Sequence, residues 1–157
     1  MKEIVVVVSN VRSIHNVGSI FRTADAVGIS KIYLCGITPI PLDRFGKVRQ
    51  EFAKVALNAE QSVAWEYKKS IVSTLTALKK KGYTIVAVEQ AKDSKPYTAL
   101  RKKSGKFALM VGNEVSGLTK SILKKADVVI EIPMHGEKES LNVSVAFGIV
   151  AYGINEP

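Results

Sequence analysis

The sequence predicts an α/β domain built on a parallel β-sheet. Its 157 residues match the size of a single domain, and no Pro/Gly-rich linker, repeat or low-complexity segment divides them. Residues 4–8 are an unbroken run of β-branched side chains, which is typical of a strand buried on both faces. Further short apolar runs alternate with stretches of helical periodicity. This alternation is typical of a parallel sheet covered by helices.

The chain is expected to begin with a strand, a helix and a second strand. After the strand at 4–8, apolar side chains recur with helical spacing until Gly28 ends the helix. They are Val17, Ile20, Phe21, Ala24 and Val27. A second strand is expected at 31–35. Residues 39–47 contain two prolines and a glycine and are typical of a loop, and residues 48–67 are mixed, with partial helical character.

The second half of the chain continues the alternation. Ile71, Leu75 and Leu78 mark a helix that ends at Gly82. A Gly-rich turn and a short helix near 119–125 come later, before the last predicted strand. The remaining strands are predicted at 84–88, 107–111 and 128–132, and the last helix at 142–154.

Polar loops are predicted at one edge of this sheet. In open parallel sheets, ligands bind outside the carboxyl ends of the strands. The segment 112–117 lies where a phosphate-binding loop would lie, but its Lys–Ser pair comes two residues too late, so we expect no nucleoside triphosphate site. No GxGxxG dinucleotide fingerprint is present either. The five loops at the carboxyl ends open at Ser9, Gly36, Glu89, Gly112 and Pro133.

Composition narrows the partners and the compartment. The formal net charge is +9, and a hydrophobic fraction of 46% is typical of a folded protein, so we expect a polyanionic partner, with solubility alone as the alternative. No apolar stretch approaches the roughly 20 residues of a membrane helix, and the N-terminal run is too short for a signal peptide. One cysteine, Cys35, and two histidines argue against disulfides and a zinc site. We expect a cytoplasmic protein without a metal or a membrane anchor.

Basic clusters are candidate contacts for the phosphate backbone of a nucleic acid. Each lies near a predicted helix end, where cations complement the helix dipole, but that effect explains one cluster better than three. The aromatic residues lack the paired pattern of a base-stacking platform, so we expect backbone binding. The clusters are Lys79-Lys80-Lys81, Arg101-Lys102-Lys103 and Lys124-Lys125.

The last helix carries no charged residue from Val143 to Tyr152. A helix that is apolar all round is buried on all sides. Since a terminal helix of a small domain usually lies on its outside, we expect a second subunit to cover it, and the alternative is a central helix of a monomer. Its small residues, Ser144, Ala146, Gly148 and Ala151, would allow close approach.

Several polar residues have both a structural and a functional interpretation. Arg22 lies almost opposite the apolar stripe of its helix, so it could pair with Asp25 or grip a phosphate at a cleft. Ser140 or Asn142 could cap the last helix, although one cap does not explain the whole string from 140 to 144. His135 is interpreted as a loop histidine, because no partner for it is evident.

Three polar segments, taken together and in order, resemble the motifs of a known family. The segments are Asn16-x-Gly18-Ser19-Ile20-x-Arg22-Thr23-Ala24-Asp25, Val111-Gly112-Asn113-Glu114-x-x-Gly117-Leu118, and Ile132-Pro133-Met134-x-Gly136 continuing to Ser140-Leu141-Asn142-Val143-Ser144-Val145-Ala146. They resemble the SPOUT superfamily, in its TrmH (SpoU) branch of RNA ribose 2′-O-methyltransferases. The resemblance covers residues 16–146.

The resemblance implies an α/β SPOUT domain over residues 1–157, without a separate RNA-binding extension. It implies a deep trefoil knot in the C-terminal part, S-adenosylmethionine as methyl donor, and a homodimer packed through the knot region. The donor pocket would include Val88, Gly112, Ile132, Met134, Ser140 and Leu141, with Glu89 beside Val88. The catalytic group would be Arg22, Asn16, Glu114, Ser140 and Asn142, with Arg22 reaching a site formed largely by the other subunit.

The implied substrate is a ribose 2′-hydroxyl of tRNA or ribosomal RNA. Guanosine is favoured by the residues found in the Gly-Asn-Glu and Ser-Leu-Asn-Val-Ser segments. The family assigns the general base to the motif arginine. Because a guanidinium stays protonated in proteins, we prefer Arg22 as a phosphate clamp that stabilises the developing alkoxide, with Ser140 or Asn142 orienting the hydroxyl. The alternative is a basic RNA-binding protein that keeps the fold without the chemistry. RNA contacts are expected at Lys79, Lys80, Lys81, Arg101, Lys102 and Lys103.

Overall fold

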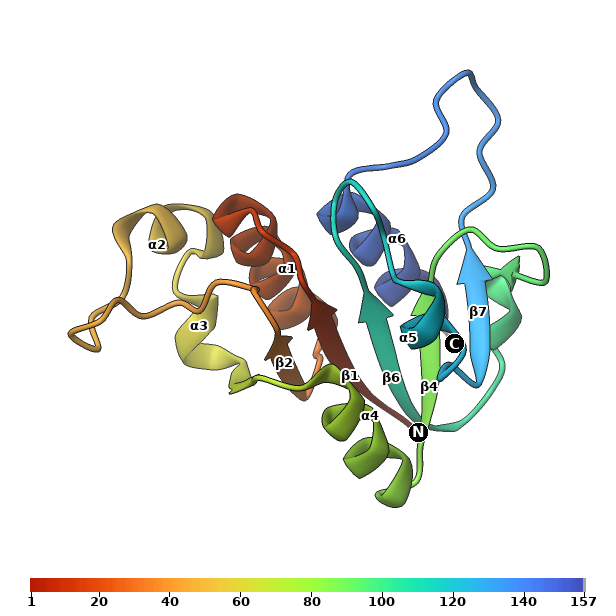
Figure 1. Cartoon of the computed structure of the whole chain (residues 1–157), viewed down its shortest axis with the longest axis horizontal. Coiled ribbons are helices and arrows are strands. Elements are labelled where there is room, and N and C mark those ends of the chain that lie inside the picture. Colours follow the sequence, from red (N-terminus) through yellow and green to blue (C-terminus); the bar gives the residue numbers. More distant parts are fainter. Residues whose placement is uncertain (157) are drawn as a thin grey trace.

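The computed structural model describes residues 1–156, which form a seven-stranded sheet with helices on both faces (Figure 1). The strand order is β3-β2-β1-β6-β4-β7-β5, and neighbouring strands pair in parallel throughout. The α/β class and the parallel sheet predicted from the sequence are therefore confirmed. None of the helices within residues 1–156 is long and apolar enough to cross a membrane.

The predicted elements occur close to their expected places. The strands are β1 (Lys2–Ser9), β2 (Lys31–Cys35), β3 (Ala64–Lys68), β4 (Tyr83–Val88), β5 (Lys95–Pro96), β6 (Gly105–Val111) and β7 (Val128–Glu131). The helices are α1 (Ile14–Val27), α2 (Gln50–Ala56), α3 (Ala59–Ser62), α4 (Ile71–Lys80), the 3₁₀ turn η1 (Tyr97–Leu100), α5 (Lys120–Leu123) and α6 (Val143–Asn155).

Two strands were not predicted, and both lie at the edges of the sheet. β3 lies outside β2, where part of its side chains face solvent, so it lacks the apolar run of a buried strand. Its Glu66 instead pairs with Lys31 at 2.9 Å and Lys68 at 2.6 Å. β5 has two residues, one of them Pro96, a residue type confined to edge strands.

The side chains of β1 explain why its sequence shows no alternation. Val6 and Val8 point into a core with α1, α2, α3 and α6, whereas Val5 and Val7 point into a second core with α4 and α5. All four valines are buried. A strand covered on both faces needs apolar residues at every position.

The loops at the carboxyl ends of β6 and β7 arch over one edge of the sheet (Figure 1). From β7 the chain returns along residues 132–142 to α6, which packs on α1 and η1. Both α1 and α6 begin at this edge, capped by Ser13 and Asn142 respectively. The knot implied by the family resemblance stays a prediction.

Candidate functional site

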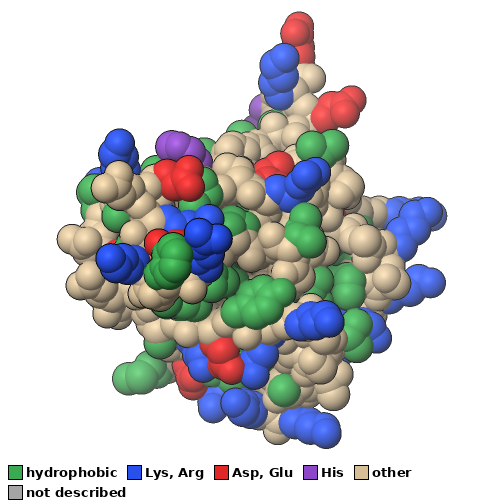
Figure 2. Space-filling view, turned by 60° about the vertical axis from the view of Figure 1, so that its left-hand side comes forward, with side chains coloured by type: hydrophobic (Ala, Val, Ile, Leu, Met, Phe, Trp, Pro, Cys, Tyr) green, Lys and Arg blue, Asp and Glu red, His purple; other side chains and the backbone are tan. Residues whose placement is uncertain are grey.

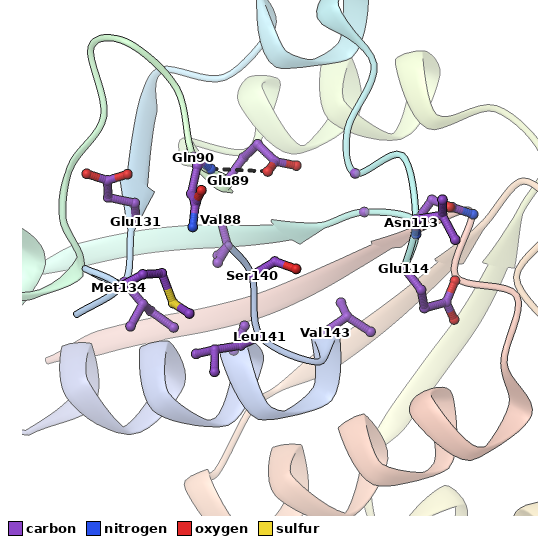
Figure 3. A pocket seen from close by; sticks show the side chains of 15 residues that line it. Val88, Glu89, Gln90, Asn113, Glu114, Glu131, Met134, Ser140, Leu141 and Val143 are labelled. Carbon is purple, nitrogen blue, oxygen red and sulfur yellow. Dashed lines mark hydrogen bonds between the residues drawn. The ribbon is translucent and has the colours of Figure 1, made fainter. Parts of the chain in front are cut away.

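A pocket opens at the carboxyl ends of β4, β6 and β7, where the parallel sheet predicts a ligand (Figure 3). It encloses about 770 Å³, including its open mouth, between three loops and the first turn of α6. The residues expected to bind the donor all line it: Val88, Gly112, Ile132, Met134, Ser140 and Leu141. Its other lining residues are Glu89, Gln90, Asn113, Glu114, Val115, Gly117, Glu131, Val143 and Ala146.

The loop from Gly112 to Leu118 forms one wall of the pocket, and hydrogen bonds hold it in place. Gly117 N–H donates to the Asn113 carbonyl at 2.9 Å, and Gly117 has a φ of +65°, which favours glycine. Glu89, at the end of β4, accepts from Leu118 N–H at 3.0 Å. The carboxylate of Glu89, the residue that follows β4, therefore holds the loop that follows the neighbouring strand β6.

Glu114 connects this loop to the start of α1. Its carboxylate accepts from Ser13 N–H at 2.9 Å, Arg12 N–H at 3.1 Å and the Asn16 side-chain amide at 3.1 Å. Burial raises the pKa of Glu114, but these hydrogen bonds and one from its own amide outweigh burial, so the pKa lies below its ordinary value. Glu114 is therefore a carboxylate at neutral pH.

We expect Glu114→Gln to lower the free energy of unfolding by about 1 kcal/mol, because an amide replaces one of the accepting oxygens. Since the folded-state pKa is depressed, the stabilisation by Glu114 is present above its ordinary pKa and is lost as pH falls through the folded-state value. Chemical unfolding from about pH 6 to about pH 3 checks this. If the free energy of unfolding falls equally with acid in wild type and in the variant, the Glu114 carboxylate does not supply this stabilisation.

Asn142 completes a hydrogen-bonded chain that joins the three motifs. Its side-chain N–H donates to Asn16 Oδ1 at 3.0 Å, and Asn16 in turn donates to Glu114. Asn142 Oδ1 accepts from Ser144 and Val145 N–H, which makes Asn142 the cap of α6 rather than Ser140. Both ends of its amide are thus occupied, so Asn142 positions its neighbours. The hydrogen bonds of residues 1–156 leave the Ser140 hydroxyl without a partner, and it lies at the pocket.

Arg22 does not line this pocket. It lies on the exposed side of α1, and the ion pairs found within residues 1–156 include none from its guanidinium. Asp25, its candidate partner from the sequence, accepts instead from Ser62 Oγ at 2.6 Å. The pairing interpretation of Arg22 is therefore wrong, and among residues 1–156 the arginine takes no part in the hydrogen bonds that join Asn16, Glu114 and Asn142.

The basic clusters lie at the opposite edge of the sheet from the pocket. Lys79–Lys81 precede β4, Lys102 and Lys103 precede β6, and Lys124 and Lys125 precede β7. Because β6, β4 and β7 are neighbours, the clusters lie at the amino ends of three adjacent strands, about 20 Å from the carboxyl end of the seven-residue β6 and about 13 Å from that of the four-residue β7. Arg101 is held at 3.0 Å by Glu156. The prediction that these residues contact RNA is not tested by their placement.

The pocket combines apolar walls with carboxylates. Val88, Ile132 and Leu141 contribute apolar side chains to the lining, and Glu89 and Glu131 contribute carboxylates. Such a lining suits a ligand with an aromatic ring and a positive charge. The described residues contain no group of three or more His, Cys, Asp and Glu side chains that could hold a metal ion. Glu131 lines the pocket but belongs to none of the three motifs. The only sequence signal for its role was its position near the end of the last predicted strand.

The sequence is similar to those of RNA methyltransferases. A tRNA (guanosine(18)-2′-O)-methyltransferase of Aquifex aeolicus is 34% identical over 96% of this chain and 68% of its own length. A 23S rRNA (guanosine-2′-O-)-methyltransferase of Escherichia coli is 33% identical over 88% of this chain and 54% of its own. The chain thus spans little more than half of the second relative.

Solved structures give the same result. The TrmH/SpoU tRNA modifying enzyme of A. aeolicus superposes with a TM-score of 0.82 at 32% identity, covering 99% of this chain and 75% of that one. An AdoMet-bound rRNA methyltransferase from Sinorhizobium meliloti gives 0.85 at 28% identity, covering 97% and 55%. The model of the SpoU rRNA Methylase family matches residues 3–152. This chain therefore belongs to the SpoU rRNA methylase family.

Proposed function

We propose that this protein transfers a methyl group from S-adenosylmethionine to a ribose 2′-hydroxyl of tRNA or ribosomal RNA in the cytoplasm, with guanosine as the nucleoside. One observation carries the proposal. Six residues from three separate segments, expected to bind the donor, line a single pocket at the carboxyl edge of the sheet. The relatives from A. aeolicus and E. coli, named as guanosine 2′-O-methyltransferases of RNA, support the substrate class.

The pocket residues fit S-adenosylmethionine by their chemistry. Val88, Ile132 and Leu141 would pack on the adenine ring, and Glu89 and Glu131 would favour the positive charges of the donor. When bound, S-adenosylmethionine supplies an electrophilic methyl group, so the protein has to orient the hydroxyl, stabilise its developing charge and let the hydroxyl proton pass to solvent water. Ser140, with its free hydroxyl at the pocket, is assigned to orient the 2′-hydroxyl, and Arg22 to hold the adjoining phosphate.

A homodimer would bring Arg22 to the pocket. In the single chain, α6 buries Phe147, Val150 and Ile154 but leaves Val145 and Tyr152 half exposed, without a charged residue beside them on the helix. Arg22 and this strip lie on neighbouring helices, since Thr23 contacts the Gly148 position of α6. A second copy that covers the strip would have its own pocket close to this Arg22.

We expect Val145→Asp to convert the dimer to a monomer, because a charge buried in an apolar interface costs several kcal/mol. Methyl transfer would fall with it. Val72→Asp on α4 is the matched control, since Val72 is 43% exposed and Val145 is 49% exposed. Sedimentation velocity measures the mass. A V145D protein that stays dimeric would rule out α6 as the interface.

The lysine clusters at the amino ends of β6, β4 and β7 are proposed to bind RNA phosphates at a distance from the methylated ribose. We expect replacement of Lys80, Lys81, Lys102 and Lys103 by Gln to raise the KM for full-length RNA. The slope of log K against log [salt] would flatten by about 0.9 for each lysine–phosphate ion pair that the substitutions remove. Donor affinity is the control. An unchanged salt slope would remove these lysines from the RNA-binding surface.

Two measurements test the proposed function. Calorimetry with S-adenosylmethionine would give a dissociation constant, and methyl transfer to total tRNA and to ribosomal RNA, followed by mapping of the modified ribose, would identify the substrate. Donor binding with 2′-O-methylation supports the proposal. RNA binding without donor binding at millimolar concentration would support the alternative, a basic RNA-binding protein without the chemistry.

A further inference from the structure

A short turn between β2 and α2 is held by a β-bridge and several hydrogen bonds. Leu42 and Val48 form an antiparallel bridge, and Asp43 N–H donates to the Lys47 carbonyl at 2.8 Å. The Asp43 carboxylate accepts from the N–H groups of Phe45 at 2.8 Å and Lys47 at 3.0 Å. Gly46 closes the turn with a φ of +77°. The backbone of residues 42–48 is therefore preorganised.

This rigid turn displays an aromatic ring to solvent. Phe45 is 72% exposed at the tip, and the guanidinium of Arg44 lies 4.7 Å from the ring centroid. An exposed single apolar residue is common on proteins, but here the turn's hydrogen bonds fix the backbone that carries the ring. Folding gains little from that arrangement, because the side chain buries little apolar surface.

The charges around the ring are positive. Arg44 and Lys47 flank it, and Arg49 follows at the base of the turn, where its Nε donates to the Leu42 carbonyl. The one acidic neighbour, Asp43, has an oxygen occupied by two backbone N–H groups. On the face that comes forward in Figure 2, Lys and Arg side chains gather beside apolar ones. An apolar protein partner would favour a wider patch without charges.

The turn belongs to the same edge of the sheet as the pocket and is connected to it. Asn10, which follows β1, accepts through Oδ1 from Ile37 N–H at 3.0 Å, at the start of the loop that carries the turn. The Asn10 carbonyl accepts from the side chain of Asn113 at 2.9 Å, and Asn113 lines the pocket. Two side-chain hydrogen bonds thus link the loop after β2 to the loop after β6.

We propose that the 42–48 turn binds an unpaired nucleotide of the RNA substrate, with its base stacked on Phe45 and its phosphates near Arg44 and Lys47. This inference rests on the proposed function. Exposed aromatic rings flanked by cations bind single-stranded RNA in this way, because every base has a flat face for stacking and each phosphate a negative charge. It amends the expectation from the sequence that RNA is bound through its backbone alone.

The test separates stacking from simple apolar contact. We expect F45A to weaken binding of a single-stranded oligonucleotide about tenfold, with binding of a double-stranded RNA of equal length unchanged. F45L keeps an apolar side chain without a ring and should behave like F45A, whereas F45Y and F45W should bind like wild type. In a W65F background, quenching of F45W fluorescence by the oligonucleotide would report stacking directly. The melting temperature and the S-adenosylmethionine affinity of F45A, F45L, F45Y and F45W should match wild type, and those of F45W in the W65F background should match W65F alone, because Trp65 packs on the core.

The outcomes distinguish this inference from the proposed function. Wild-type affinity in F45A, or in F45L, would overturn the inference even if the protein methylates RNA. A loss of affinity in F45A and F45L with no methyl transfer by wild type would overturn the proposed function and leave the RNA-binding turn. If wild type binds neither RNA form, both are overturned.

Discussion

Arg22→Lys is expected to lower kcat/KM for RNA methylation by about 10²- to 10³-fold, the usual cost of removing a group that stabilises a developing oxyanion. Lysine keeps the charge but loses the planar fork that grips a phosphate with two parallel hydrogen bonds. Because Arg22 does not line the donor pocket, S-adenosylmethionine affinity should not change. Single-turnover methyl transfer together with calorimetry separates these two effects. Retention of most activity in R22K would exclude the bidentate clamp.

Mixed dimers of the proposed homodimeric assembly can show which pocket each arginine serves. Arg22→Ala removes the clamp, and Ser140→Trp fills the mouth of the pocket, so each homodimer should be inactive. If Arg22 acts across the dimer, a heterodimer of the two variants contains one intact site and recovers up to about half of the wild-type activity. If it acts within its own chain, the heterodimer contains no intact site. Absence of recovery would therefore contradict the composite site.

The buried strands could be predicted from the sequence because their environment is uniform. β1 is covered on both faces, and a run of β-branched residues of this length is typical of such a strand. β3 escaped prediction for the opposite reason, since Glu66 and Lys68 lie at an edge where solvent and ion pairs replace apolar contacts. Edge strands carry little local signal.

The motifs that form the site could be predicted from the sequence, but the roles of their individual residues could not. Asn142 was a candidate for orienting the substrate, yet its amide is occupied by the cap of α6 and by Asn16, a contact across 126 positions of sequence. The lysine clusters looked like three scattered helix ends, and they meet only because the strand order is β6-β4-β7. Nothing in the sequence indicated that the Phe45 ring is exposed, because the exposure of a side chain depends on the whole fold.

Gly112→Ala is expected to weaken S-adenosylmethionine binding at least about tenfold and to cost about 1–3 kcal/mol of stability. A Cβ at this position would lie 2.7 Å from Gly117 C and Leu118 N, which are backbone atoms. A side chain could rotate away from such a contact, but this backbone is held by the Asn113–Gly117 bridge and by Glu89. The strain therefore has to displace the wall of the pocket.

Gly136→Ala is the matched control, because a Cβ there has no heavy atom within 4 Å and the residue lies in the loop that follows β7. The same substitution is then made once against a packed backbone and once in open space. Calorimetry should give a weaker donor affinity for G112A and a wild-type value for G136A. Thermal unfolding shows whether G112A is still folded at the temperature of the titration. If G112A is folded and binds the donor as tightly as wild type, the 112–118 loop is not the wall that holds it.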